Sequence, residues 1–123
     1  MPVFTHMKNS VLVVTVDGDY TTGELRRAGA RGLEADDVPN PVPVLLDMSG
    51  AAGIGKKSTD DIRATGEFFG ERAEFMTRVA VLAPSDVAFG LMNVGGVFAT
   101  SAGLETRPFR SRTEALEWLG AAG

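Results

Sequence analysis

The stretch that decides the fold is VLLDMSGAAGIGKKST, residues Val44–Thr59. The stretch begins inside an apolar run, Val42–Met48, of the kind that forms a strand covered on both faces of a sheet. The glycine-rich segment Gly50–Lys56 follows this run. Next comes Ser58–Asp61, whose Ser-Thr-Asp-Asp pattern is typical of a capping box at the start of a helix. A strand, a glycine-rich connection and a capped helix in this order predict one βα unit of an α/β protein.

Similar patterns on either side extend this unit along the chain. The predicted strands are Val3–Met7, Val11–Val16, Val42–Met48, Arg78–Leu82 and Glu105–Phe109. The predicted helices run from about Gly23 to Ala35, from Ser58 to about Phe75, from the Ala83–Asp86 turn to about Ala99, and from Ser111 to Leu119. The order ββαβαβαβα favours an antiparallel hairpin followed by parallel strands that right-handed crossovers connect. We therefore expect residues 1–123 to form a single α/β domain, a mixed sheet of about five strands with helices packed on it.

Composition excludes several classes of function. The chain has 123 residues and a net charge of −4, whereas a nucleic-acid partner would need a basic surface. The absence of cysteine excludes disulfides and cysteine-bound metals and is typical of a reducing cytoplasm, where we place the protein. His6 is the only histidine, and we expect no catalytic residues, no metal and no cofactor. The uncharged stretch Val87–Leu104 contains glycines and polar residues, so we expect a buried or interface helix there rather than a membrane span.

The segment Gly50–Lys56 nearly matches a phosphate-binding P-loop. In that motif glycines let backbone N–H groups wrap phosphates, a lysine contacts the phosphates, and the next residue, Ser or Thr, holds magnesium. Here Lys57 takes the place of the hydroxyl, and Ser58 comes one position late. We therefore rank a nucleotide enzyme low and keep weak anion binding at the helix start as an alternative. The residues of this candidate switch or anion-binding loop are Asp47, Ser49, Gly50, Gly53, Gly55, Lys56 and Ser58.

Two of these residues also have a purely structural interpretation. Asp47 ends a strand, where α/β folds place ligand sites, but its carboxylate equally fits an acceptor of backbone N–H groups that holds the segment after it. Ser58 fits a helix N-cap whose hydroxyl accepts a hydrogen bond from the Asp61 N–H.

Four segments, in this order and spacing, resemble the SpoIIAA-like (STAS-like) family over nearly the full length. They are Gly18–Thr21, Leu45–Gly50, Arg78–Leu82 and Arg107–Leu119, the last of which is similar to the family's closing F-x-x-x-x-x-A-x-x-W-L signature. The resemblance implies a small STAS-like α/β fold with no known catalytic residues. It also implies a switch serine where the second helix begins, because anti-sigma-factor antagonists of the wider family are phosphorylated there. Ser58 is the nearest positional match, but the family's Asp-Ser-Ser-Gly motif is replaced by Lys56–Thr59.

The predicted helix over Val87–Ala99 is apolar nearly all round, whereas a surface helix should have a polar face. We favour a homodimer interface, which Met, Phe and Leu side chains suit. One alternative is that this helix forms a hydrophobic pocket or lid for an acyl or lipid-like ligand. The other is ordinary burial in the core. The residues concerned are Phe89, Leu91, Met92, Asn93, Val94, Val97 and Phe98.

The sequence thus predicts a non-enzymatic STAS-like binding or regulatory module that acts through protein–protein contact, as a dimer. A carrier or sensor of a small hydrophobic ligand is the alternative, and nucleotide or phosphate binding at Gly50–Lys56 is a weaker one. Trp118 is expected to anchor the last helix on the sheet.

Overall fold

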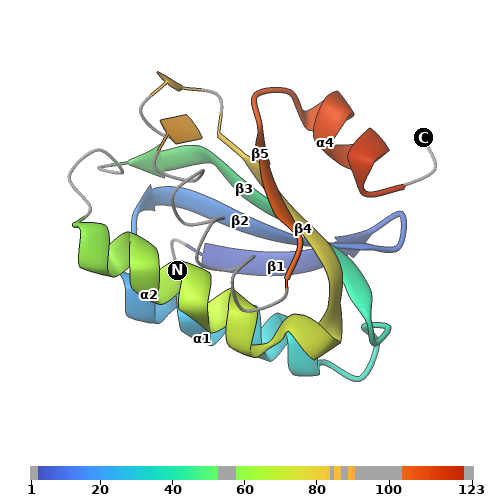
Figure 1. Ribbon diagram of the computed structural model, residues 1–123. Coiled ribbons are helices and arrows are strands. Elements are labelled where there is room, and N and C mark those ends of the chain that lie inside the picture. Colours follow the sequence, from blue (N-terminus) through green and yellow to red (C-terminus); the bar gives the residue numbers. More distant parts are fainter. Residues whose placement is uncertain (1–2, 53–57, 84, 87–88, 91–103, 121–123) are drawn as a thin grey trace.

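The computed structural model describes residues 3–52, 58–83, 85–86, 89–90 and 104–120 (Figure 1). Along the chain the elements are β1 (Val3–Lys8), β2 (Val11–Asp19), α1 (Thr22–Glu34), β3 (Val42–Ala52), α2 (Thr59–Glu71), a 3-10 turn (Ala73–Phe75), β4 (Met76–Leu82), β5 (Thr106–Phe109) and α4 (Arg112–Trp118). The predicted order is confirmed for these elements. Most of the helix predicted up to Ala99 lies outside the described residues.

The five described strands form one mixed sheet in the order β1-β2-β3-β4-β5. β1 and β2 are antiparallel, and each later strand runs parallel to the one before it. The β1–β2 hairpin turns at Asn9 and Ser10, whose φ angles of 51° and 67° are the positive values that a two-residue hairpin turn needs. The predicted antiparallel hairpin and parallel crossovers are therefore both confirmed.

The sheet has two differently covered faces, because side chains alternate along each strand (Figure 1). On β3, Val44, Leu46 and Met48 belong to the core cluster under α1 and α2. Leu45 belongs to a second, smaller cluster under α4. In Figure 1, α1 and α2 lie along the lower side of the sheet and α4 lies on the upper side.

Side-chain caps begin the helices where the sequence predicts them. Thr21 starts α1 with a reciprocal capping box, and Ser58 and Asp61 form another at α2. At α4, Ser111 accepts a hydrogen bond from the Glu114 N–H at 3.4 Å, without the reverse bond that would complete a capping box. These caps satisfy N–H groups that the first helical turn leaves unpaired.

The end of β3 differs from the prediction. β3 continues past Met48 to Ala52, and its last three residues pair with Asp17–Asp19 of β2. A register shift between Thr15 and Asp17 lets both strands continue beyond their apolar runs. Ser49 and Gly50 therefore belong to the sheet and not to a loop.

The end of α2 differs as well. The helix stops at Glu71 rather than at about Phe75, because Arg72 leaves the helical backbone, with φ −108° and ψ 23°. The 3-10 turn over Ala73–Phe75 then redirects the chain into β4, which begins at Met76, earlier than the predicted Arg78.

Candidate functional site

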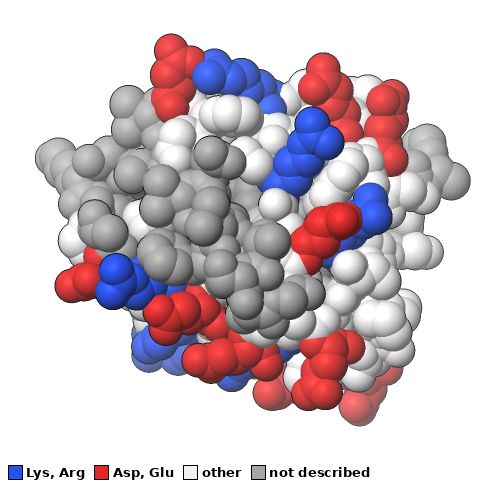
Figure 2. Space-filling view, viewed as in Figure 1, with Lys and Arg blue, Asp and Glu red and all other residues white. Residues whose placement is uncertain are grey.

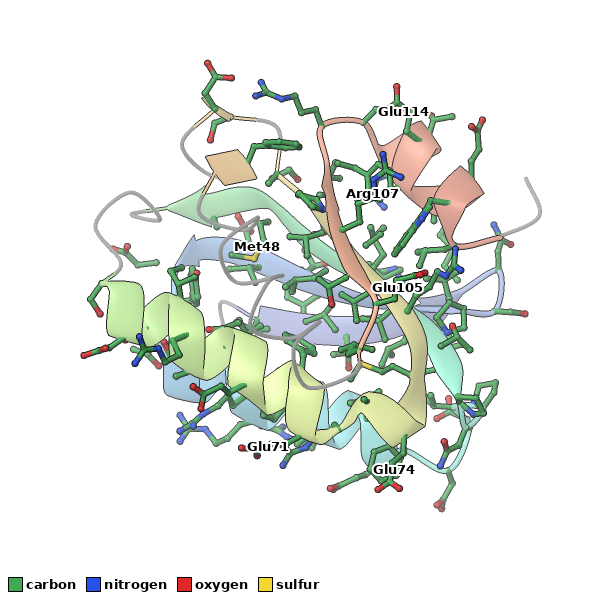
Figure 3. The ribbon with its side chains drawn as sticks, in the orientation of Figure 1. Met48, Glu71, Glu74, Glu105, Arg107 and Glu114 are labelled. Carbon is green, nitrogen blue, oxygen red and sulfur yellow. The ribbon has the colours of Figure 1, made fainter. Side chains whose placement is uncertain are left out.

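Asp47 is the distinctive residue at the carboxyl end of the parallel strands. It lies on β3 between Thr15 of β2 and Leu82 of β4. It is 4% exposed and is the one buried polar or charged residue in the part of the chain that the structure describes. Its neighbour Met48 lies on the opposite side of the strand, towards α2 (Figure 3). A buried carboxylate needs partners that replace its lost hydration.

Ser49 and Arg112 are those partners. Asp47 Oδ1 accepts hydrogen bonds from the Ser49 N–H at 3.0 Å and from Ser49 Oγ at 2.5 Å. Arg112, in the first turn of α4, donates from Nη2 to Asp47 Oδ2 and forms an ion pair with it. Both carboxylate oxygens are thus bonded, and the backbone bond that the sequence predicts for Asp47 is present. The ion pair ties the start of α4 to the end of β3.

The partners of Asp47 are accessible, whereas Asp47 is not. The Arg112 side chain is 46% exposed and the Asp47 side chain 6%, and Ser49 is also exposed. A guanidinium carries five N–H donors in a rigid fork, so a bond from one nitrogen leaves donors for a second acceptor. The site therefore presents a positioned cation and a hydroxyl to solvent above a buried counter-charge.

The other end of α4 is held by Trp118, as predicted. The Trp118 ring lies 5.5 Å from the Phe109 ring of β5 between centroids. The Arg78 guanidinium lies 4.6 Å from the Trp118 ring and donates to the Trp118 carbonyl at 2.9 Å. Together with the Asp47–Arg112 pair, these contacts hold α4 against β3, β4 and β5.

Gly50 has a packing role that differs from the predicted phosphate-loop role. It pairs with Asp17 of β2, and a Cβ at this position would lie 3.2 Å from both the Val16 carbonyl oxygen and Asp17 Oδ1. Glycine is therefore favoured by the close approach of β2 at its register shift, because a Cβ would push against the Val16 carbonyl. An extended, paired backbone at Gly50 does not wrap a phosphate, which removes the first glycine of the P-loop pattern.

Ser58 and Asp61 form a second polar cluster, at the start of α2. Ser58 Oγ accepts from the Asp61 N–H and donates to Asp61 Oδ2, each at 3.0 Å. Asp61 Oδ1 accepts from Thr22 Oγ1 at 3.4 Å, which links the starts of α1 and α2. The predicted N-cap role of Ser58 is thus confirmed. Gly53, Gly55 and Lys56 of the candidate loop lie outside the described residues.

Tyr20 connects this cluster to the core. Burial, and secondly the negative charge of Asp61, raise the pKa of the Tyr20 phenol from 10.0 to about 12. Its side chain belongs to the core cluster under α1 and α2. Tyr20 therefore stays neutral at physiological pH and serves as a packing residue.

Phe89 is the one member of the predicted interface-or-pocket set that the structure describes. It packs, partly buried, against the cluster under α1 and α2. The Arg110 guanidinium lies 4.7 Å from the centre of its ring and pairs with Asp86. The other members lie outside the described residues: Leu91, Met92, Asn93, Val94, Val97 and Phe98.

Two kinds of site are not found within the described residues. No group of three or more His, Asp or Glu side chains there could hold a metal ion. None of the helices in that part of the chain is long and apolar enough to cross a membrane.

The family profile described as SpoIIAA-like matches residues 11–120. The chain belongs to the SpoIIAA-like family. A crystal structure of similar architecture is that of an uncharacterized DUF3478-family protein from Shewanella loihica PV-4, itself described as having a SpoIIAA-like fold. The two chains are 16% identical, with a TM-score of 0.62 and coverage of 95% of this chain and 91% of the other, so the likeness concerns the fold. No curated protein matches.

The family match confirms the predicted resemblance and fold class. SpoIIAA-like domains are typically regulatory protein-interaction modules and are generally non-enzymatic.

Sequence reasoning identified Asp47 and Ser49 but missed Arg112. A carboxylate at the end of an apolar strand signals that a cation is needed, but the chain has 12 lysines and arginines to choose from. Arg112 lies 65 residues from Asp47 along the chain. Only the packing of α4 on the sheet shows which cation is used.

Proposed function

We propose that this protein is a non-enzymatic binding and regulatory module that recognises a protein partner at the carboxyl end of β3. The contact surface comprises Ser49 and Arg112, the two exposed side chains bonded to Asp47. Membership of the SpoIIAA-like family supports the general role. The observation that supports this location is the half-exposed Arg112 guanidinium, held in place by a buried carboxylate.

Arg112 is preorganised for binding by its ion pair with Asp47. A free surface arginine loses rotamer freedom when it binds, and that loss weakens binding. Asp47 already orients Arg112, so a partner carboxylate that reaches the remaining N–H donors encounters a fixed cation. Arginine is enriched at the energetic centres of protein interfaces for this kind of contact. We expect the partner to present an acidic or carbonyl-rich segment here.

The test is an affinity capture from a lysate of the source cells, with quantitative mass spectrometry. The tagged wild-type chain is compared with Arg112→Gln and Ser49→Ala, and Arg107→Gln serves as the matched control. Arg107 is an exposed arginine on β5 that has no ion-pair partner within the described part of the chain. We expect the partner to be depleted with Arg112→Gln and retained with Arg107→Gln.

A captured partner is then purified, and its dissociation constant is measured by calorimetry. Loss of one charged contact at the centre of an interface should weaken binding by about tenfold or more. Circular dichroism verifies that each variant is folded. Equal affinity for wild type and Arg112→Gln would place the contact surface elsewhere, and enzymatic turnover by the purified chain would refute the non-enzymatic role.

A further inference from the structure

A groove of about 410 Å³ runs between α1 and α2, on the face of the molecule away from the Asp47 site. Its lining residues recur at helical spacing on both helices. From α1 they are Gly23, Arg26, Arg27 and Ala30, and from α2 they are Ala64, Glu67, Phe68, Glu71 and Arg72. Phe68 is buried, and its ring would lie 3.1 Å from a Cβ at Gly29, so the two helices are closely packed beneath the groove.

The two walls of the groove carry opposite charge. Arg26 and Arg27 line the α1 wall, and Glu67 and Glu71 line the α2 wall. Arg72 lies at the end of the α2 wall. Its Nη1 forms an ion pair with Glu71 Oε2 at 3.9 Å, and its guanidinium carbon lies 4.2 Å from the centre of the Phe68 ring. Acidic and basic side chains lie next to each other along this edge of the molecule, and Glu71 extends from α2 there (Figures 2 and 3).

Three of the charged side chains that line the groove are not neutralised within the described part of the subunit. In the described residues, Arg26, Arg27 and Glu67 have no ion-pair partner. Unpaired charges are ordinary on a protein surface, but here the unpaired arginines lie on one wall and the unpaired glutamate lies on the other. Such a surface is complementary to another surface with the same charges in exchanged positions.

The two helices run parallel and are in step with each other. Thr22 contacts Asp61, and Gly29 contacts Phe68, so residues that differ by 39 in number lie at the same level. Arg27 is therefore level with position 66, one residue, or about 1.5 Å, from Glu67. Arg27 and Glu67 thus lie at matching heights on the two walls of the groove.

This arrangement makes the surface complementary to itself. A two-fold axis along the groove places α1 of one copy over α2 of the other without changing the level along the helices. Arg27 of each copy then faces Glu67 of the other, and four charges of alternating sign surround the axis. A two-fold axis across the groove would instead place α1 over α1 and bring arginines together. Symmetric interfaces form by pairing a patch with itself in this way.

We propose that the α1/α2 surface is a homodimer interface in which Arg27 of each copy pairs with Glu67 of the other about an axis along the groove. This interface is separate from the partner surface at β3 and α4, so a dimer leaves Arg112 accessible. Exposed ion pairs are individually weak and are screened by salt. The dimer is therefore expected to be weak and to dissociate as ionic strength rises.

The experiment is a charge exchange at Arg27 and Glu67, measured by sedimentation velocity over a range of protein concentrations at low salt. Arg27→Glu and Glu67→Arg each place like charges opposite each other twice per dimer. Each variant should dimerise about tenfold or more weakly than wild type. The double variant Arg27→Glu/Glu67→Arg should dimerise like wild type, because both pairs are restored with exchanged signs.

Mixing the two single variants gives the sharper test. A heterodimer of Arg27→Glu with Glu67→Arg has an opposite-charge pair at both symmetry-related contacts. Native mass spectrometry distinguishes the heterodimer from both homodimers by mass, and the heterodimer should predominate. The matched controls are Arg107→Glu and Glu114→Arg, which reverse exposed charges on β5 and α4 and should leave dimerisation unchanged.

Each result decides the proposal. A wild-type chain that stays monomeric at every concentration would overturn it, as would a dimer that the two single variants leave intact. Failure of the mixture to form a heterodimer, with both variants folded by circular dichroism, would also overturn it. Restoration in both the mixture and the double variant would establish the interface.

Discussion

The two faces of the sheet are covered in different ways. Among the described residues, the cluster under α1 and α2 contains 20 buried side chains and the cluster under α4 contains 8. The larger cluster is apolar apart from the tyrosine hydroxyl. The smaller face holds the buried carboxylate Asp47, which needs Arg112 from α4. The short helix α4 is thus attached through one ion pair and a few rings, while α1 and α2 are attached by a broad apolar surface.

The two faces are therefore expected to contribute differently to folding stability and to the response to a partner. Apolar burial is proportional to area and does not depend on any single partner. An ion pair over a buried carboxylate depends on one guanidinium, and another acceptor can compete for that guanidinium. The α1/α2 face is therefore expected to determine folding stability, and the α4 face is where a partner can act on the fold.

The largest effect should come from the core of the α1/α2 face. Leu25→Ala removes a side chain that is fully buried, and we expect the free energy of unfolding to fall by about 2–5 kcal/mol. Leu116→Ala, in the partly buried part of α4, should cost less than about 2 kcal/mol. Urea unfolding monitored by circular dichroism measures both. Equal losses of unfolding free energy in Leu25→Ala and Leu116→Ala would contradict the larger contribution of the α1/α2 face to stability.

The next effect should come from the ion pair on the α4 face. Arg112→Ala leaves the Asp47 carboxylate buried with only Ser49 as partner, and we expect a loss of about 2–3 kcal/mol in unfolding free energy. Adding Asp47→Asn to Arg112→Ala removes the uncompensated charge and should recover part of this loss. The control Arg107→Ala should change stability by less than about 0.5 kcal/mol. A double variant that is less stable than Arg112→Ala would show that the charge is not the cause.

Tyr20 gives the α1/α2 face a dependence on alkaline pH. Its pKa is raised to about 12 in the folded chain from 10.0, so its contribution to stability is fully present below pH 10.0 and is lost as pH rises through 12. Above pH 10.0 the unfolded chain releases the phenol proton while the folded chain retains it. We expect this one group to lower the unfolding free energy by about 2 kcal/mol over that range.

Comparison with Tyr20→Phe isolates this effect from the other groups that titrate at alkaline pH. Urea unfolding at a series of pH values should give a flatter profile for the variant. Tyr20 is the only tyrosine, so the absorbance of its phenolate reports the pKa directly. A midpoint near 10 would refute the predicted shift.

The smallest effects should come from the helix caps. Ser58→Ala removes the 3.0 Å cap bond of α2 and should cost about 1 kcal/mol. Ser111→Ala removes the longer 3.4 Å cap bond of α4 and should cost less. Thermal unfolding measures both, with the exposed Thr113→Ala in α4 as control. A larger cost at Ser111 than at Ser58 would show that α4 is the more tightly specified helix.

Much of the fold could be predicted because its signals are local. The apolar run from Val42 and the serine cap at Ser58 each act over a few residues, so they predicted the positions of β3 and α2. The end of β3 could not be predicted in this way. Ser49 and Gly50 have no strand signal of their own and are extended because they pair with β2 beyond its register shift.

The candidate site likewise contains residues with a local sequence signal and one residue without such a signal. The sequence indicated Asp47, Ser49 and Ser58, since polar residues at a strand end and at a helix start stand out against an apolar pattern. It did not indicate Arg112, because an ion pair between residues 65 apart arises only when α4 packs on the sheet. The same holds for the α1/α2 groove, because Arg27 and Glu67 are 40 residues apart in the chain (67 − 27) and line one groove only once both helices lie side by side.

The sequence by itself thus determined the order of the elements, the family and the polar ends of β3 and α2, because hydrophobic periodicity and capping are short-range effects. The tertiary structure alone decided which cation neutralises Asp47, why position 50 favours glycine, and that Arg27 and Glu67 lie on opposite walls of one groove. Those features depend on distances between segments remote in the chain, and no local pattern encodes such distances.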